Sequence, residues 1–237
     1  MDANELYDPE FRELIKSKKP TIIIPVGSVE QHGAHLPITT DSDIVTEIAS
    51  RLGKKCNFIV FPTVSYGNSL EHSPLFNISG RFQHFLNDII DSLVENKIKS
   101  IIILNGHHGN NVDLHQLDHM YNHPGAGQFE YGKLARISFY SYWHFMEHEF
   151  DHAGFVETSI MLAISDKVKM KKAKKGLITK GMSEKEIQRI NKLSTQPGGF
   201  PKVAKNGVWG DPTGATKKDG EKLLAEIVRN LAKECQS

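Results

Sequence analysis

Residues 21–37 have the sequence TIIIPVGSVEQHGAHLP, in which a β-branched apolar run gives way to a loop that holds glycines, histidines and a glutamate. The run 21–26 is apolar throughout rather than alternating, which is typical of a strand buried on both faces of its sheet. In open α/β sheets, ligands bind in the crevice beyond the carboxyl ends of the strands. We therefore expect the polar residues of 27–37 to lie at the ligand-binding edge of such a sheet.

Strand and helix patterns alternate along the rest of the chain. Further apolar runs predict strands at 58–61, 101–104 and 135–139. Apolar residues at helical spacing predict helices at 42–52, 81–95, 111–121, 155–164 and 218–232. This alternation indicates one domain over residues 1–237, with a three-layer α/β/α fold around a mostly parallel sheet. Residues 194–214 are rich in glycine and proline and predict a long loop, of the kind that often forms lids or oligomer contacts.

Composition narrows the classes of protein to consider. Hydrophobic residues make up 39% of the 237 residues, which is enough for a sizeable core. The formal net charge of +1 favours neither nucleic acid nor an anionic membrane as a partner. We interpret the basic run 167–175 as solvated surface, with an anion-binding patch as the alternative.

The N-terminal sequence and the two cysteines indicate in which cellular compartment we expect the protein. No segment approaches the roughly 20 apolar residues of a membrane span, and the acidic N-terminus lacks the apolar run of a signal peptide, so we expect a cytoplasmic protein. Cys56 and Cys235 match no metal-ligand spacing and are expected to be free thiols.

Carboxylate and imidazole side chains gather in three short segments that follow or precede the predicted elements. They are Glu30, His32 and Asp41 in the first, His107 and His108 in the second, and His152 and Glu157 in the third. Such a mixed oxygen and nitrogen set suits Zn²⁺ or Mn²⁺ and excludes a thiolate site. A carboxylate that bridges two ions about 3.5 Å apart would hold a water molecule and lower its pKa. Spacing alone leaves a metal hydrolase and a merely polar crevice as equal alternatives.

Two of these carboxylates also have ordinary structural interpretations. Asp41 lies at the expected start of a helix, where Asp41 or Ser42 could serve equally well as an N-cap. Glu157 lies in the first turn of another predicted helix, where a negative charge complements the helix dipole.

Taken together, the motifs resemble those of the creatininase (creatinine amidohydrolase) family. The resemblance is carried by VGSVEQHGAHLP at 26–37 with Thr40 and Asp41 after it, by NGHHGN at 105–110, and by HAG at 152–154 with ETS at 157–159. It implies a creatininase-type α/β fold, a two-metal centre and, commonly, a homohexamer. It also implies metal ligands at Glu30, His32, Asp41 and His107, with Asp41 as the bridge, and a proton-shuttling histidine at His152.

The chain departs from creatininase proper at two positions. Creatininase has a further glutamate ligand two residues after the histidine of the NGH motif, where this chain has Gly109; Glu157 is then the natural replacement. Creatininase closes tryptophans over its substrate, whereas the residue four before His152 is His148, which weakens the case for creatinine.

Segment 66–72 resembles the substrate-side loop of related branches of the family. We therefore expect His72, together with His108 and Gly109, to contact substrate, with an exposed loop histidine as the alternative for His72.

The resemblance implies a metal-dependent amidohydrolase that cleaves a small non-peptide C–N bond, in creatinine, another cyclic amide or a formamide, by metal-activated water. We expect two divalent ions per chain, Zn²⁺ first, with Mn²⁺ or Fe²⁺ as alternatives. One alternative within the family is a deformylase of 2-amino-5-formylamino-6-ribosylaminopyrimidin-4(3H)-one 5'-monophosphate, as in archaeal flavin and deazaflavin biosynthesis. Its phosphate would need cationic partners, for which Arg81, Lys202 and Lys205 are candidates.

Three further functions are alternatives to cleavage of a small non-peptide amide. The family also has peptide-cleaving members that act in cofactor maturation. A two-metal phosphoesterase uses similar ligands. A non-catalytic, metal-binding assembly subunit is the alternative of another class, against which the crowding of histidines and carboxylates beyond four-coordination counts.

Overall fold

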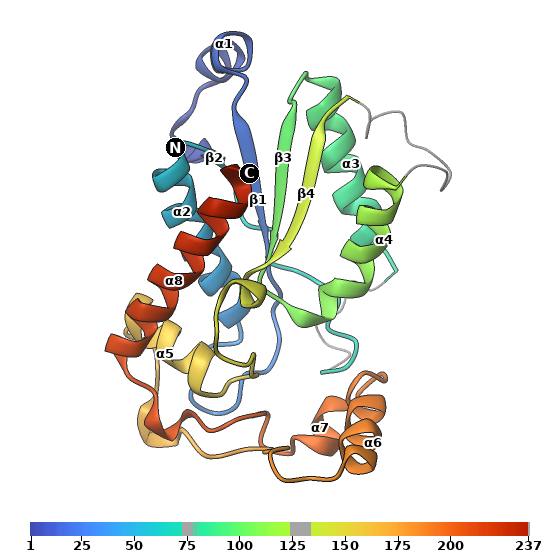
Figure 1. The fold of residues 1–237 in the computed structure, drawn as a ribbon, viewed down its shortest axis with the longest axis vertical. Coiled ribbons are helices and arrows are strands. Elements are labelled where there is room, and N and C mark those ends of the chain that lie inside the picture. Colours follow the sequence, from blue (N-terminus) through green and yellow to red (C-terminus); the bar gives the residue numbers. More distant parts are fainter. Residues whose placement is uncertain (73–77, 79, 124–133, 237) are drawn as a thin grey trace.

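A parallel sheet forms the middle layer of the molecule (Figure 1). The computed structural model describes residues 1–72, 78, 80–123 and 134–236. Within these residues the sheet has four strands in the order β2-β1-β3-β4, and each pair of neighbouring strands is parallel. Their bounds are β1 Thr21–Val26, β2 Ile59–Val60, β3 Ser100–Asn105 and β4 Arg136–Ser141. The predicted three-layer α/β/α fold around a mostly parallel sheet is confirmed.

Helices cover both faces of this sheet. The bounds are α1 Asp8–Lys18, α2 Thr40–Cys56, α3 Phe82–Glu95, α4 Asn111–Asn122, α5 Phe155–Ile164, α6 Glu184–Ser194, α7 Phe200–Val203 and α8 Lys217–Gln236. Figure 1 shows α2, α5 and α8 on one side of the strands and α3 and α4 on the other, with α6 and α7 set apart beyond the strand ends. Within the part of the chain that is described, no helix is both long and apolar enough to cross a membrane.

Successive residues of β1 and β3 pack into opposite cores. Ile23 and Ile102 belong to the cluster formed with α2, α5 and α8, whereas Ile22 and Ile101 belong to the cluster formed with α3 and α4. All four are buried. Because full burial of one such side chain contributes about 1.5–3 kcal/mol, the β-branched runs explain why these two strands form the centre of the sheet.

The carboxyl ends of β1 and β3 lie side by side, next to the first turn of α2. Val26 pairs with Asn105, and the Gly106 amide donates to the Val26 carbonyl at 2.8 Å. A Cβ on Gly27 would lie 2.6 Å from the Ser42 Cα, and one on Gly106 would lie 2.7 Å from the Asp41 carbonyl oxygen. Two glycines therefore let the first turn of α2 pack directly against both strand ends, which places Asp41 at the edge of the sheet.

Some expected elements differ from those observed. The predicted long loop at 194–214 is wrong in part, because it contains α7 and the 3-10 turn Pro212–Gly214. The strand expected at 58–61 is reduced to the two residues of β2. Helices α1 and α6 were not expected, because few of their residues are apolar and most are exposed.

Candidate metal centre

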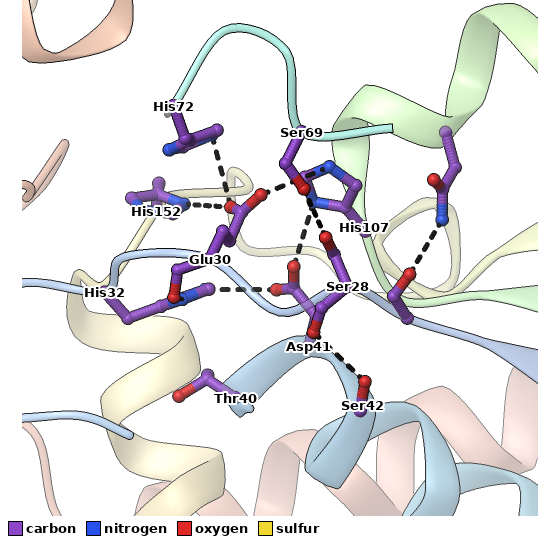
Figure 2. A network of polar contacts seen from close by, with 12 residues as sticks. Ser28, Glu30, His32, Thr40, Asp41, Ser42, Ser69, His72, His107 and His152 are labelled. Carbon is purple, nitrogen blue, oxygen red and sulfur yellow. Dashed lines mark hydrogen bonds and ion pairs between the residues drawn. The ribbon is translucent and has the colours of Figure 1, made fainter. Parts of the chain in front are cut away.

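Asp41 lies between two histidines at the start of α2 (Figure 2). Its Oδ1 is 3.0 Å from His32 Nε2, and its Oδ2 is 2.9 Å from His107 Nδ1. The N-cap interpretation of Asp41 and Ser42 is wrong, because the N-cap residue is Thr39 and it makes no side-chain capping bond. The first turn of α2 instead directs the Asp41 carboxylate between the loops that follow β1 and β3.

Each of the two histidines is oriented by a backbone carbonyl. His32 Nδ1 lies 3.3 Å from the Glu30 carbonyl oxygen, and His107 Nε2 lies 2.9 Å from the Asn68 carbonyl oxygen. These nitrogens donate, because a carbonyl oxygen only accepts. His32 Nε2 and His107 Nδ1 are therefore the nitrogens that face Asp41 and that could bind a metal ion.

Two glutamates flank this arrangement on opposite sides. Glu30 Oε2 is 3.3 Å from His107 Nε2, whereas Glu157 Oε2 is 3.6 Å from His32 Nε2. Glu157 Oε2 also accepts a hydrogen bond of 2.6 Å from the Ala153 amide, which turns its carboxylate back across the start of α5. The first-turn position of Glu157 thus directs it into the cluster.

The donor atoms form overlapping sets of three. Glu30, Asp41 and His107 offer ligand atoms within 4.8 Å of one another, and so do His32, Asp41 and Glu157. Asp41 belongs to both sets, as expected of a carboxylate that bridges two ions. A third set consists of Glu30, His32 and His152.

Buried carboxylate oxygens that lack well-aligned hydrogen bonds indicate that cations belong here. Among the described residues, both side-chain oxygens of Glu30, Oδ2 of Asp41 and Oε1 of Glu157 are buried and lack a well-aligned hydrogen bond. Burying a carboxylate whose hydrogen bonds are incomplete is costly. The oxygen and imidazole donors fit divalent ions such as Zn²⁺ or Mn²⁺.

The pKa values of the two glutamates and two histidines around Asp41 are all raised. Burial raises the pKa of Glu30 and of Glu157 to about 8, although nearby histidines oppose it. Burial lowers the pKa of His32, but the charges of Asp41 and Glu157 outweigh it and raise the pKa to about 10. Burial also lowers the pKa of His107, but Glu30 and Asp41 raise it to about 10. In the absence of metal, protons held by these histidines and glutamates offset the negative charge that bound cations would otherwise offset.

Two further histidines lie above the cluster, on its cavity side. His72 Nε2 is 3.2 Å from Glu30 Oε1, and His152 Nδ1 is 3.7 Å from the same oxygen (Figure 2). Burial, reinforced by the neighbouring histidines, holds the pKa of both well below the ordinary range. They are therefore neutral imidazoles that face the site without belonging to the two sets around Asp41.

A cavity of about 610 Å³ opens over the cluster. Its aromatic wall consists of Phe150, Phe200 and Trp209, and α6 contributes Ile187, Asn191 and Ser194. His108 lines it as well, with its ring stacked on Phe150 at 6.2 Å and 16°. Of the expected substrate contacts, His72 and His108 line the cavity, whereas Gly109 is not among its lining residues.

Gly109 makes room for the loop that carries His72. A Cβ at this position would lie 2.1 Å from the Asn68 carbonyl oxygen and 2.5 Å from Glu71 Oε1. A side chain at 109 would therefore displace the backbone that orients His107. Glu71, which sequence reasoning missed although it precedes His72, lines the cavity near the place that such a side chain would take.

The sequence matches one family profile and is similar to several characterised proteins. The family profile described as "Creatininase: Creatinine amidohydrolase" matches residues 4–235. The mycofactocin precursor peptide peptidase of Mycobacterium ulcerans (strain Agy99) is 28% identical over 233 residues, which cover 90% of this chain and 84% of that protein. The creatinine amidohydrolase of Pseudomonas putida is 24% identical over 197 residues, which cover 68% and 71%. The 5'-monophosphate deformylase of Methanosphaera stadtmanae, whose substrate is the formylaminopyrimidine named above, is 32% identical over 106 residues, which cover 40% and 43%.

Solved structures share the fold. A crystal structure of creatinine amidohydrolase (creatininase) superposes with a TM-score of 0.73 at 21% identity, covering 98% of this chain and 95% of the other. Similar creatininase structures include a manganese form and a mutant of Zn-Zn type, each with a TM-score of 0.71.

Proposed function

Because this chain belongs to the creatininase family, we propose that it is a metal-dependent amidohydrolase that cleaves a C–N bond of a small non-peptide amide. The observation that carries the proposal is the position of Asp41 between His32 and His107, with Glu30 and Glu157 on either side. We propose these five residues as the ligands of two divalent ions, with Zn²⁺ first and Mn²⁺ or Fe²⁺ as alternatives. Forms of similar creatininase structures with zinc and manganese support this choice.

The side chains around the ligands suit hydrolysis. Bound divalent ions would supply Lewis acidity that activates water and polarises the amide carbonyl. The Gln31 carbonyl accepts from His152 Nε2 at 3.0 Å, so His152 Nδ1 is the free base and faces Glu30. From there, His152 can take a proton from the attacking water and deliver it to the leaving nitrogen. Phe200 packs against His152 at 4.7 Å between ring centroids and shields it from bulk water.

A panel of amides tests this function directly. We expect the protein purified without chelator to hydrolyse at least one class among cyclic amides, formamides and short peptides, and to lose that activity reversibly with a chelator. Product formation followed by mass spectrometry measures both effects. Activity that survives complete metal removal would contradict the proposed mechanism, and a metal-loaded protein inactive on the whole panel would favour a non-catalytic metal-binding role.

The side chains described in the cavity wall include no cation that could bind the phosphate of a phosphorylated substrate. Among the described residues, no lysine or arginine lines it, and Arg81, Lys202 and Lys205 are absent from its wall. Helix α6 turns Ile187, Asn191 and Ser194 to the cavity. Each of its cations lies two residues before one of these three: Lys185, Arg189 and Lys192. An offset of two residues is about 200° around a helix. We therefore propose a neutral or cationic substrate, rather than the 5'-monophosphate of the deformylase alternative.

A cation placed on this wall should change the preference for substrate charge. With a matched pair of amides that differ only in a neutral or anionic end group, we expect the wild type to favour the neutral one. Asn191→Lys should raise kcat/KM for the anionic amide relative to the neutral one by about tenfold, since a hydrogen bond to a charged group contributes about 1.5–3 kcal/mol. Gln188→Lys is the control, because it adds the same charge to α6 at a residue outside the cavity wall. A wild type that prefers the anionic amide would contradict this interpretation.

Peptide cleavage is the second candidate. The cavity of about 610 Å³ lies within the range of roughly 300–1,000 Å³ that is typical of sites for drug-sized ligands. It therefore has room for a short peptide as well as for a single small ring. The similarity to the mycofactocin precursor peptide peptidase, which extends over 90% of this chain, favours keeping this candidate. The peptide arm of the amide panel separates the two.

A further inference from the structure

Gln31 lies between His72 and His152 and has no role in the ligand set. Its Nε2 is 3.0 Å from His72 Nδ1 and 3.2 Å from His152 Nε2, and its Oε1 accepts from the Gly33 amide at 3.3 Å. The last contact decides which end of the side chain is the amide nitrogen, because an amide N–H can donate only to the oxygen. The Gln31 nitrogen is therefore the end that faces the histidines.

The donor and acceptor roles then follow one from another. The Gln31 backbone carbonyl accepts from His152 Nε2, so this ring nitrogen is already a donor and cannot accept from the Gln31 side chain. The Gln31 amide therefore donates to His72 Nδ1, which must carry a lone pair. An imidazole ring with a lone pair on Nδ1 carries its N–H on Nε2, so the proton of His72 resides on the nitrogen 3.2 Å from Glu30 Oε1.

We propose that Gln31 is a positioning residue that fixes the tautomer of His72, so that His72 Nε2–H faces the carboxylate of Glu30. Gly207 leaves room for this arrangement, because a Cβ on it would lie 1.8 Å from Gln31 Oε1. The polar partners that surround a ligating carboxylate orient it, and loss of such a partner costs about 10–100-fold in metal affinity or activity. The consequence for metal binding rests on the proposed function, whereas the tautomer itself does not.

The tautomer can be measured directly. In zinc-loaded protein with ¹⁵N-labelled histidine, long-range ¹H–¹⁵N correlation should show His72 with its proton on Nε2. Gln31→Glu replaces the donor by an acceptor and should move the proton to Nδ1, while the matched exchange Gln116→Glu, on the exposed face of α4, should leave it on Nε2. If no zinc binds, the same spectrum of the metal-free protein still decides the tautomer, so failure of the proposed function is distinguishable. A proton that stays on Nε2 in Gln31→Glu would overturn the proposal.

A second readout tests whether Gln31 acts through His72. Gln31→Met removes the donor without adding charge, and we expect it to weaken zinc binding by about tenfold or more. In a His72→Ala background, the same substitution should cause no further loss, because the residue through which it acts is gone. An equal loss in both backgrounds would show that Gln31 acts on the metal site by another route and would also overturn the proposal. Gln116→Met is the control and should bind zinc as the wild type does.

Discussion

Asp41→Ala is expected to lose both metal ions and with them all but a trace of activity. Asp41 is shared by the set with Glu30 and His107 and the set with His32 and Glu157, whereas His32 belongs to only one of these two. His32→Ala should therefore lose mainly one ion. Because metal ions contribute several kcal/mol of transition-state stabilisation, we expect kcat/KM of Asp41→Ala to fall by about 10³-fold or more. Elemental analysis and amide hydrolysis measure the two effects.

A neighbouring aspartate provides the control. Asp43 accepts a hydrogen bond of 3.0 Å from Thr39 Oγ1 and lies outside the donor sets, so Asp43→Ala should keep its metal. Asp41→Asn, which preserves shape but removes the charge, covers the case in which Asp41→Ala fails to fold. If Asp43→Ala loses both ions and Asp41→Ala retains them, the wrong aspartate has been assigned.

His152→Ala is expected to depress turnover by about 10²–10⁴-fold, the usual contribution of a positioned general acid–base group, while metal content stays intact. The reason is that His152 Nδ1 faces the site from the cavity side, 3.7 Å from Glu30 Oε1. Amides with poor, basic leaving nitrogens should suffer more than activated ones, because only the former need a proton to depart. Steady-state kinetics on a matched pair of amides, with elemental analysis alongside, measures this.

Two other results of His152→Ala would contradict a role in proton transfer. Loss of one metal ion would make His152 a ligand, in keeping with its set with Glu30 and His32. Unchanged turnover on an unactivated amide would remove His152 from catalysis and transfer the proton-transfer role to His72 or His108. His84→Ala, on an exposed position of α3, is the control for the loss of an imidazole.

The sequence predicted the parts of the site that lie close to strand ends. The apolar runs of β1 and β3 identify the central strands, and the polar segments that follow them meet because parallel strands end at the same edge. What the spacing could not decide was the direction of the Asp41 side chain. That depends on Gly27 and Gly106, which let α2 begin against the strand ends.

The cavity wall was largely beyond prediction. Phe200 and Trp209 lie in 194–214, where no periodic pattern exists, and their place depends on tertiary packing alone. Helix α6 has few apolar residues, but the capping box of Ser183 and Glu186 marks its start and could have revealed it. Glu71 reaches the cavity because Gly109 leaves space for its loop, a relation between distant residues that one sequence does not disclose.

The metal content of the protein is the direct test of a two-ion centre. Protein purified without chelator, reconstituted with Zn²⁺ or Mn²⁺ and freed of excess metal should contain two ions per chain by elemental analysis, since Glu30, His32, Asp41, His107 and Glu157 form two donor sets with one shared carboxylate. Zero or trace metal after reconstitution of folded protein would contradict a two-ion centre at these residues.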